Sequence, residues 1–166
     1  MVLVTGLNEN LEGEEMDQSN SVGSGDKANL LLPAPQRKLM EVVAKTGKPV
    51  ILINMTGSAM DLRFAEENFS AVVQGWYPGA RGGKAIAELL FGKYSFSGKL
   101  PVTFYNDSDE LPAFTDYAME NRTYRYFTGG VLYPFGYGLT YGKTEVTKAE
   151  MRDDGEHYTV TATVKK

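Results

Sequence analysis

The chain of 166 residues contains no cysteine and a single histidine, His157. The absence of cysteine excludes disulfide bonds and thiolate zinc sites. One histidine cannot form a histidine-rich metal cluster, and it excludes a Ser-His-Asp triad built around any other position. His157 lies among residues typical of a terminal strand, where we expect it to be structural.

Long apolar runs and concentrations of basic charge are also missing. No stretch approaches the roughly 20 apolar residues needed to span a bilayer, and Met1–Leu7 lacks the basic start and the apolar length of a signal peptide. The net charge is −4 and the basic residues are scattered, so neither nucleic acid nor a membrane is expected as a partner. These absences slightly favour a cytoplasmic location, but the location stays unknown because a leader upstream of Met1 would leave no trace here.

What the chain does contain is an ordinary globular composition, with 42% hydrophobic and 23% charged residues. Its first hundred residues alternate between two kinds of hydrophobic pattern. The pattern predicts a helix over 30–46, a strand over 50–53, a helix over 61–68, a strand over 71–73 and a helix over 84–91. Alternating strands and helices indicate a parallel α/β sheet, and an uninterrupted apolar strand is typical of one covered on both sides.

An acidic stretch, Leu11–Gln18, follows the first apolar run, Val2–Leu7, and contains three glutamates and an aspartate. It belongs to a polar segment, 8–29, that is predicted to be one long loop. A strand that opens onto such a loop places carboxylates at the carboxyl edge of the sheet, where open α/β folds bind ligands. The alternative is a solvated acidic loop without a chemical role.

The composition changes after Leu100, where prolines, glycines and tyrosines predict irregular chain packed by aromatic rings. It changes again after Lys143. Tyr158, Val160 and the following apolar residues alternate with threonines, which is the period-two pattern of a strand.

Several segments occur in a fixed order along the chain, namely Gly47–Leu52, Gly75–Gly92, Ser97–Phe104, Tyr124–Phe127 and Leu132–Tyr141. In this order they resemble the C-terminal α/β-sandwich domain of family 3 glycoside hydrolases, the β-glucosidases and β-xylosidases. The resemblance runs from Val2 to Tyr141. It implies an α/β fold, a partial parallel-sheet α/β sandwich with helices on both faces over residues 1–142. An aromatic-rich irregular segment ends this domain, and residues 143–166 would begin a fibronectin type III-like β-sandwich.

The resemblance also implies a chemistry. Enzymes of this kind are retaining glycosidases that use two carboxyl groups about 5–5.5 Å apart. The nucleophile comes from a (β/α)8 barrel of the same enzyme, and a loop of the α/β sandwich supplies the general acid/base. The implied substrates are β-linked gluco- or xylo-oligosaccharides or glycosides, and no metal or organic cofactor is needed.

Glu14 aligns best with the acid/base glutamate of the family, and Glu12 is the competing carboxylate. Family members often have Gly where this chain has Glu15 and Arg where it has Gln18, which leaves the shape of the loop open. Asp17 is expected to cap or brace the loop.

Other features of the sequence have competing explanations. Trp76 and Tyr77 follow a predicted strand, and an aromatic face suits the CH surface of a sugar, but core or interdomain packing explains them as well. Glu12 and Trp76 are therefore weaker candidates for substrate contact. The glycines of Gly79–Ala85 resemble a phosphate loop but lack its spacing and hydroxyl, so a turn and a helix start explain them. Arg122 and Arg125 are expected to anchor the chain against neighbouring domains.

Both ends of the chain look cut, because a buried-type strand begins at once and the second domain stops early. The isolated chain is therefore expected to be nearly inactive. One alternative is a non-catalytic carbohydrate-binding or assembly module that docks on a separate barrel subunit. A flavodoxin-like nucleotide-binding domain would explain the βα pattern, but neither the acidic stretch nor the aromatic segment.

Overall fold

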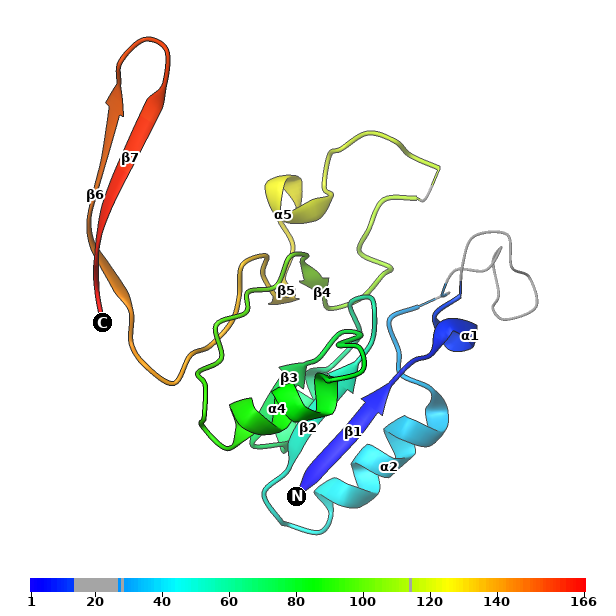
Figure 1. The fold of residues 1–166 in the computed structure, drawn as a ribbon. Coiled ribbons are helices and arrows are strands. Elements are labelled where there is room, and N and C mark those ends of the chain that lie inside the picture. The colour runs from blue at the N-terminus through cyan, green and yellow to red at the C-terminus, as the bar shows by residue number, and fades with distance from the viewer. Residues whose placement is uncertain (14–26, 28, 114) are drawn as a thin grey trace.

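A parallel sheet forms the centre of the first hundred residues in the computed structural model, which describes residues 1–13, 27, 29–113 and 115–166 (Figure 1). Its strands are β1 (Val2–Gly6), β2 (Ile51–Met55) and β3 (Ala71–Gln74), in the spatial order β1-β2-β3. Both pairings are parallel, so the carboxyl ends of the three strands meet at one edge. The predicted parallel α/β arrangement is confirmed.

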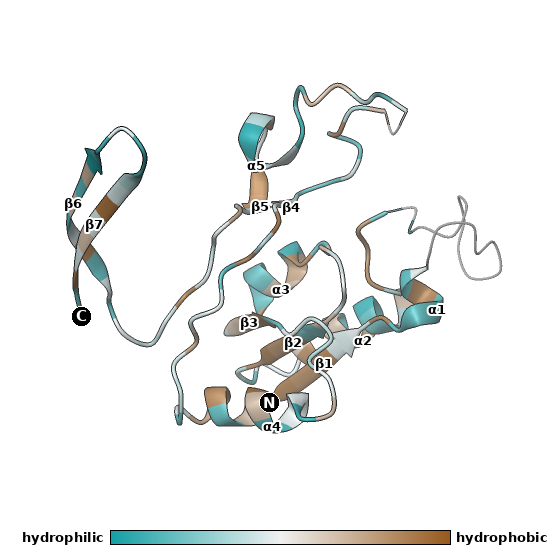
Figure 2. Ribbon diagram, turned by 45° about the horizontal axis from the view of Figure 1, so that its top comes forward, coloured by the Kyte–Doolittle hydropathy of each residue, from teal (hydrophilic) through white to brown (hydrophobic). Residues whose placement is uncertain are grey.

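Helices lie on both faces of this sheet. They are α2 (Ala34–Ala44) and α3 (Arg63–Asn68) on one face and α4 (Gly82–Leu90) on the other, as a comparison of Figures 1 and 2 shows. The central strand is therefore covered twice, and Leu52 and Ile53 on successive positions are both buried. On β1 the residues alternate: Leu3 and Thr5 are buried, whereas Val2 and Val4 are more than half exposed.

The hydrophobic core fills the α2–α3 side of the sheet and extends into the aromatic segment. Leu3 and Leu52 from the sheet pack there with Met40 and Val43 of α2. The ring of Phe104 is fully buried against the same cluster. Truncating such a buried side chain to alanine typically costs about 2–5 kcal/mol, so these residues hold the sheet and the aromatic segment together.

The aromatic segment contains three short elements, β4 (Phe104–Tyr105), α5 (Thr123–Tyr126) and β5 (Val131–Tyr133). β4 and β5 pair antiparallel, which places the rings of Phe104 and Tyr133 edge to face with centroids 5.7 Å apart. Most of this segment is irregular, as predicted. The exceptions are the three short elements, and the packing of Phe104 on Tyr133 accompanies the pairing of β4 with β5.

An antiparallel hairpin ends the chain, formed by β6 (Glu145–Asp153) and β7 (Tyr158–Lys165). Every residue of both strands is exposed, and the hairpin projects away from the parallel sheet (Figure 1). The predicted period-two strand is confirmed as β7.

Two predicted segments have different bounds in the structure. The helix expected over 30–46, with its entry at Pro33 and Pro35, spans Ala34–Ala44, because Pro33 restricts the residue before it and supplies the fixed φ suited to a helix start. The segment predicted as one loop from residue 8 begins with a short helix, α1 (Glu9–Glu12). Asn8 caps it, since its side-chain oxygen accepts the N–H of Leu11 at 3.0 Å.

Candidate functional site

The carboxyl edge of the parallel sheet gathers a group of polar side chains around Glu12. Glu12 is the last residue of α1, and Gly13 ends the helix with φ 78°, a conformation that favours glycine. The strand before α1 is fixed by α2, because the Gln36 side chain accepts the N–H of Gly6 at 2.9 Å and donates to its carbonyl at 2.7 Å. A side chain at Gly6 would meet the Met55 carbonyl oxygen. The end of β1 is thus held closely against β2, and α1 begins three residues further along the chain.

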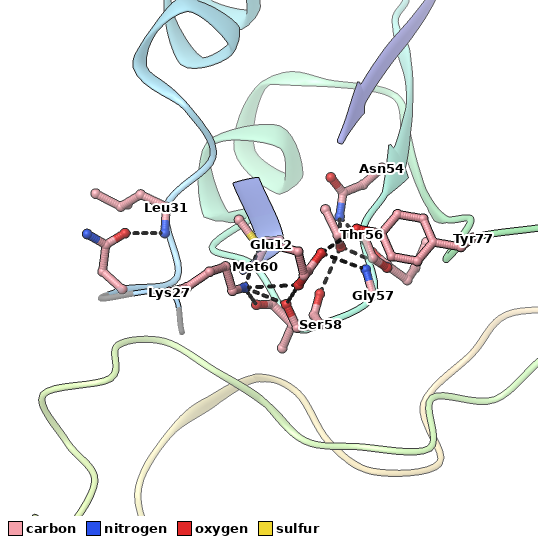
Figure 3. A network of polar contacts seen from close by, with 12 residues as sticks. Glu12, Lys27, Leu31, Asn54, Thr56, Gly57, Ser58, Met60 and Tyr77 are labelled. Carbon is pink, nitrogen blue, oxygen red and sulfur yellow. Dashed lines mark hydrogen bonds and ion pairs between the residues drawn. The ribbon is translucent and has the colours of Figure 1, made fainter. Parts of the chain in front are cut away.

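Four donors surround the Glu12 carboxylate, as Figure 3 shows. Oε2 accepts the backbone N–H of Gly57 at 3.1 Å and the hydroxyl of Tyr77 at 2.5 Å. Oε1 accepts the hydroxyl of Ser58 and lies 3.8 Å from Nζ of Lys27. The donors come from the turn after β2, from the chain after β3 and from beyond the acidic stretch. Glu12 therefore links three separate segments.

Lys27 is the second charged member of this group. Its ammonium donates to the Ser58 hydroxyl at 2.5 Å, to the Ala59 carbonyl at 3.3 Å and to the sulfur of Met60 at 3.0 Å. The Ser58 hydroxyl accepts from Lys27 and donates to Glu12, so it bridges the two charges. Only 16% of the Lys27 side chain and 18% of the Glu12 side chain are exposed. The pair is thus largely removed from water.

A buried polar network in the sheet supports the turn that carries Ser58. Asn54 on β2 accepts the Thr5 hydroxyl at 3.3 Å and donates to Gln74 at 2.8 Å and to Thr56 at 3.0 Å. Thr56 in turn donates to the backbone carbonyl of Ser58 at 2.8 Å. Asn54 and Thr56 are fully buried, and their hydrogen bonds offset the cost of removing these polar groups from water. Such a satisfied network favours one arrangement of the three strands.

The surroundings shift the pKa values of all three ionisable members of the group. Burial raises the pKa of Glu12, but hydrogen bonds from Ser58, Tyr77 and Gly57 and the charge of Lys27 outweigh it, so the pKa lies below its ordinary value. Burial and the bond to Glu12 raise the pKa of Tyr77 to about 12. Burial lowers the pKa of Lys27, against the opposing charge of Glu12. At neutral pH Glu12 is consequently an anion and Tyr77 a neutral donor.

This arrangement defines what Glu12 can do chemically. A carboxyl group with a lowered pKa is a poor proton donor near neutrality, because a general acid works best with a pKa near the operating pH. Three hydrogen bonds already engage most of the lone pairs that a substrate hydroxyl would otherwise use, and the Lys27 ammonium lies near the remaining position. These contacts suit an anchoring group. Acid/base or sugar-binding roles for Glu12 stay predictions.

Glu14, the predicted acid/base residue, lies outside the residues that the structure describes, together with Glu15, Asp17 and Gln18. Its role therefore stays a prediction. In the sequence it follows Glu12 by two positions, and the described residues 12, 13 and 27 bracket the stretch that contains it.

Trp76 directly precedes Tyr77, and its backbone has a φ of 53°, which is uncommon outside glycine. Its partly buried ring packs on the core, edge to face with Phe104 at a centroid distance of 6.2 Å. This contact accounts for the ring by packing, and the predicted sugar contact stays untested.

Of the four partners of Glu12, three were not singled out from the sequence, namely Gly57, Ser58 and Lys27. Gly57 and Ser58 could have been found from the sequence. They lie in the turn just after β2, so the rule that carboxyl ends of parallel strands share one edge points to them. Tyr77 was noted for its ring, whereas its hydroxyl is what contacts Glu12. Lys27 carried no signal, since only the folded chain brings it back to Glu12.

Other sequence features have local explanations in the fold. A side chain at Gly82 would meet Pro78 at 2.3 Å, and Gly79 has φ 69°, so the glycines serve the turn before α4. Arg122 donates from Nη2 to three backbone carbonyls between positions 112 and 116. His157 lies exposed next to the β6–β7 turn. Anchoring of neighbouring domains by Arg122 and Arg125 stays a prediction.

The described residues offer neither a metal site nor a membrane-spanning helix. No three His, Cys, Asp or Glu side chains there lie close enough together to hold a metal ion. No helix in this part of the chain has the length and apolarity to cross a membrane.

A parallel α/β sheet with polar groups at its carboxyl edge defines a broad class of ligand-binding and catalytic domains. Comparison with known proteins narrows that class. The family described as "Glycosyl hydrolase family 3 C-terminal domain" matches residues 1–141. The chain therefore belongs to glycosyl hydrolase family 3 and corresponds to its C-terminal domain.

Individual relatives agree with this assignment. A xylan 1,4-beta-xylosidase of Xylanibacter ruminicola is 44% identical over 96% of this chain and 19% of the relative. A periplasmic beta-glucosidase of Salmonella typhimurium is 34% identical over 92% of this chain and 21% of the relative. A solved β-glucosidase from Erythrobacter marinus superposes with a TM-score of 0.74 and 32% identity, covering 92% of this chain and 20% of that one. The chain spans about a fifth of the length of the curated relatives it matches.

Proposed function

We propose that this chain is the acid/base-bearing part of a retaining β-glycosidase that hydrolyses terminal β-glucosides or β-xylosides. The observation that carries the proposal is the family match, because it spans residues 1–141 and so includes the acidic stretch. The printed names of the relatives, a xylosidase and a glucosidase, support these two substrate classes. Within the proposal, Glu14 is the general acid/base.

The proposed reaction has two steps with balanced proton transfers. An aspartate carboxylate from a barrel domain of the same enzyme attacks the anomeric carbon while Glu14 protonates the departing glycosidic oxygen. The resulting glycosyl-enzyme is then hydrolysed by water, whose proton returns to Glu14 as the second carbon–oxygen bond breaks. The chain alone lacks the partner carboxylate of this scheme, so it is expected to be nearly inactive in isolation.

The environment of Glu12 supports this division of labour between the two nearby glutamates. Glu12 is ionised and accepts three hydrogen bonds, which favours proton donation by another carboxyl group of the acidic stretch. Glu14 is the residue there that aligns with the family acid/base.

Residues 143–166 are proposed to begin a fibronectin type III-like module, and residues 1–142 to form the preceding domain. In support, the family match ends at residue 141, and the β6–β7 hairpin that follows has a period-two pattern with both strands exposed. A sandwich buries such a pattern against a second sheet.

Glu14→Gln in the full-length enzyme tests the role of Glu14. General acid catalysis contributes about 10²–10⁴-fold, so kcat/KM for an unactivated disaccharide should fall by that factor. For an aryl glycoside with an acidic phenol, glycosylation needs no acid and should be nearly unchanged. Added azide, which needs no general base, should accelerate turnover and yield a glycosyl azide of retained configuration. Equal losses on both substrates, or no loss, would refute the role.

A further inference from the structure

We propose that Glu12 is a positioning residue that, together with Lys27, ties positions 12 and 27 of the chain to the turn Gly57–Ser58, with Tyr77 as a further donor to Glu12. The anchor itself is defined by described residues alone. Its effect on the acid/base step rests on the proposed function of Glu14.

The first argument is that positions 12 and 27 meet at one hydroxyl. They are fifteen residues apart in the sequence, yet the Glu12 carboxylate and the Lys27 ammonium both hydrogen-bond to Ser58. Bringing two separated chain positions together costs loop-closure entropy, which the contacts at the junction must offset. The charge-assisted hydrogen bonds of Glu12 and Lys27 are the contacts that offset it.

The second argument is that the anchor point is rigid. The Ser58 carbonyl accepts from Thr56, and Thr56 is bonded to Asn54 and Gln74 within the sheet. The Gly57 N–H and the Tyr77 hydroxyl approach the same carboxylate oxygen from the ends of β2 and β3. A group held by two adjacent strands is placed more accurately than one held by a loop alone.

The third argument is that simpler explanations leave the contacts unexplained. A glutamate needed only for solubility would be exposed, as Glu9 on the same short helix is, whereas Glu12 is 18% exposed. A glutamate that receives a substrate hydroxyl would need accessible lone pairs, whereas the Glu12 carboxylate already accepts three hydrogen bonds and has the Lys27 ammonium 3.8 Å from Oε1. Anchoring accounts for all four contacts.

Tests of this proposal use the full-length enzyme with the variants Glu12→Gln, Ser58→Ala and Tyr77→Phe, and Glu9→Gln as the matched control. Misplacing a catalytic group by about 1 Å can cost roughly 10²-fold, so Glu12→Gln should lower kcat/KM for an unactivated disaccharide by about that factor. The loss should be several-fold smaller for an activated aryl glycoside, because its glycosylation needs no proton. Tyr77→Phe removes one donor to Glu12 and should lose less. Ser58→Ala removes both the donor to Glu12 and the acceptor of Lys27, so its loss should exceed that of Tyr77→Phe, with the same leaving-group dependence. Glu9→Gln should match the wild type on both substrates.

A second readout does not depend on catalysis. Lys27 and Ala28 form a trypsin site whose lysine is held by Ser58 and Glu12. Cleavage after Lys27, followed by mass spectrometry under native conditions, should be faster in Glu12→Gln than in the wild type, and unchanged in Glu9→Gln. Comparison with cleavage after another lysine, such as the exposed Lys38, corrects for global unfolding.

The outcomes separate this proposal from the one on Glu14. If cleavage after Lys27 accelerates but Glu14→Gln has no leaving-group effect, the anchor stands and the acid/base role fails. If Glu14→Gln behaves as proposed while Glu12→Gln matches Glu9→Gln in both readouts, the anchor is refuted. A Glu12→Gln enzyme that loses both substrates equally, with unchanged cleavage after Lys27, also overturns the positioning role.

Discussion

The parallel sheet and the β6–β7 hairpin use the same kinds of polar residue to opposite effect. In the sheet, Asn54 and Thr56 are fully buried, and each hydrogen-bonds to neighbours on its own and adjacent strands. In the hairpin, Thr159 and Thr161 also lie on a strand, but every residue around them is exposed. A polar side chain on a strand therefore has no fixed energetic value, since burial decides what its loss costs.

The two regions also differ in how they relate to the candidate site. The sheet joins its buried network to the carboxylate of Glu12 through Thr56 and Ser58. The family match covers the sheet and ends at residue 141, before the hairpin begins. Sensitivity to substitution should accordingly be concentrated at the sheet edge and be low in the hairpin.

The largest effect on stability is expected for Asn54→Ala. It leaves the Thr5 hydroxyl and the Gln74 carbonyl oxygen without their partner and opens a space in the sheet. Each buried group left unsatisfied costs about 1–3 kcal/mol, so the free energy of unfolding should fall by at least about 3 kcal/mol. Urea unfolding followed by circular dichroism measures it.

Thr161→Ala in the hairpin is the matched control. Exposed substitutions usually change stability by less than about 0.5 kcal/mol, and Thr161 is exposed. If both variants lost the same free energy, the contrast between buried and exposed polar residues would be wrong for this protein.

A smaller effect is expected at Tyr133, where the same contrast can be drawn between two tyrosine hydroxyls. Tyr133 is 8% exposed and donates to Glu66 of α3, whereas Tyr141 is 60% exposed and donates to the Leu89 carbonyl at 2.8 Å. Tyr133→Phe should cost about 1.5 kcal/mol, the upper end for a hydrogen bond, and Tyr141→Phe about 0.5 kcal/mol. Thermal unfolding of the two variants side by side tests the ranking, and a reversed order would contradict it.

The pH dependence of stability sharpens the comparison at Glu12. Its pKa in the folded chain is lowered from 4.5, so the folded state binds fewer protons there than the unfolded state. The stabilisation that Glu12 gives the folded state is therefore fully present above pH 4.5, the pKa of the unfolded chain. It is lost as the pH falls through the lower pKa of the folded chain.

Unfolding free energies measured from neutral pH downward should thus decline less steeply in Glu12→Gln than in the wild type. The pKa values of Glu41 and Asp61 are lowered as well, but these groups are present in both proteins and cancel in the difference. A Glu12→Gln profile parallel to that of the wild type would show that Glu12 has the same pKa folded and unfolded.

Much of the fold could be predicted from the sequence because its signals are local. The uninterrupted apolar run of β2 and the alternating threonines of β7 each indicate a strand by themselves. The prolines at 33 and 35 indicate where α2 is entered, and the helix starts at Ala34 although the apolar pattern begins before Pro33, because the backbone restriction of proline overrides that pattern. Short elements such as β4 depend on pairing with a strand far along the chain, which leaves little local trace.

The candidate site was predictable to a smaller extent. The position of the acidic stretch after the first strand correctly indicated carboxylates at the sheet edge, and Glu12 is there. The ionised, anchored state of Glu12 could not be predicted, because its donors come from Lys27, Ser58 and Tyr77 and only the fold assembles them. Sequence spacing carries no information on such a group.

The smallest effect is expected for the exposed ion pair of the hairpin. Nζ of Lys148 lies 2.7 Å from Oε1 of Glu150, and the two side chains are 63% and 64% exposed. In the Lys27–Glu12 pair the same two atoms are farther apart, at 3.8 Å, but each side chain is less than a fifth exposed. Exposed pairs contribute about 0–1 kcal/mol and are screened by salt, so Lys148→Ala should change stability by less than about 0.5 kcal/mol. Lys27→Ala should lower the free energy of unfolding by more, despite the longer distance, because it leaves the largely buried Glu12 carboxylate without its counter-ion. Unfolding of both variants at low and high ionic strength decides whether proximity or burial governs the value of a charge pair in this chain, and a larger loss for Lys148→Ala would favour proximity.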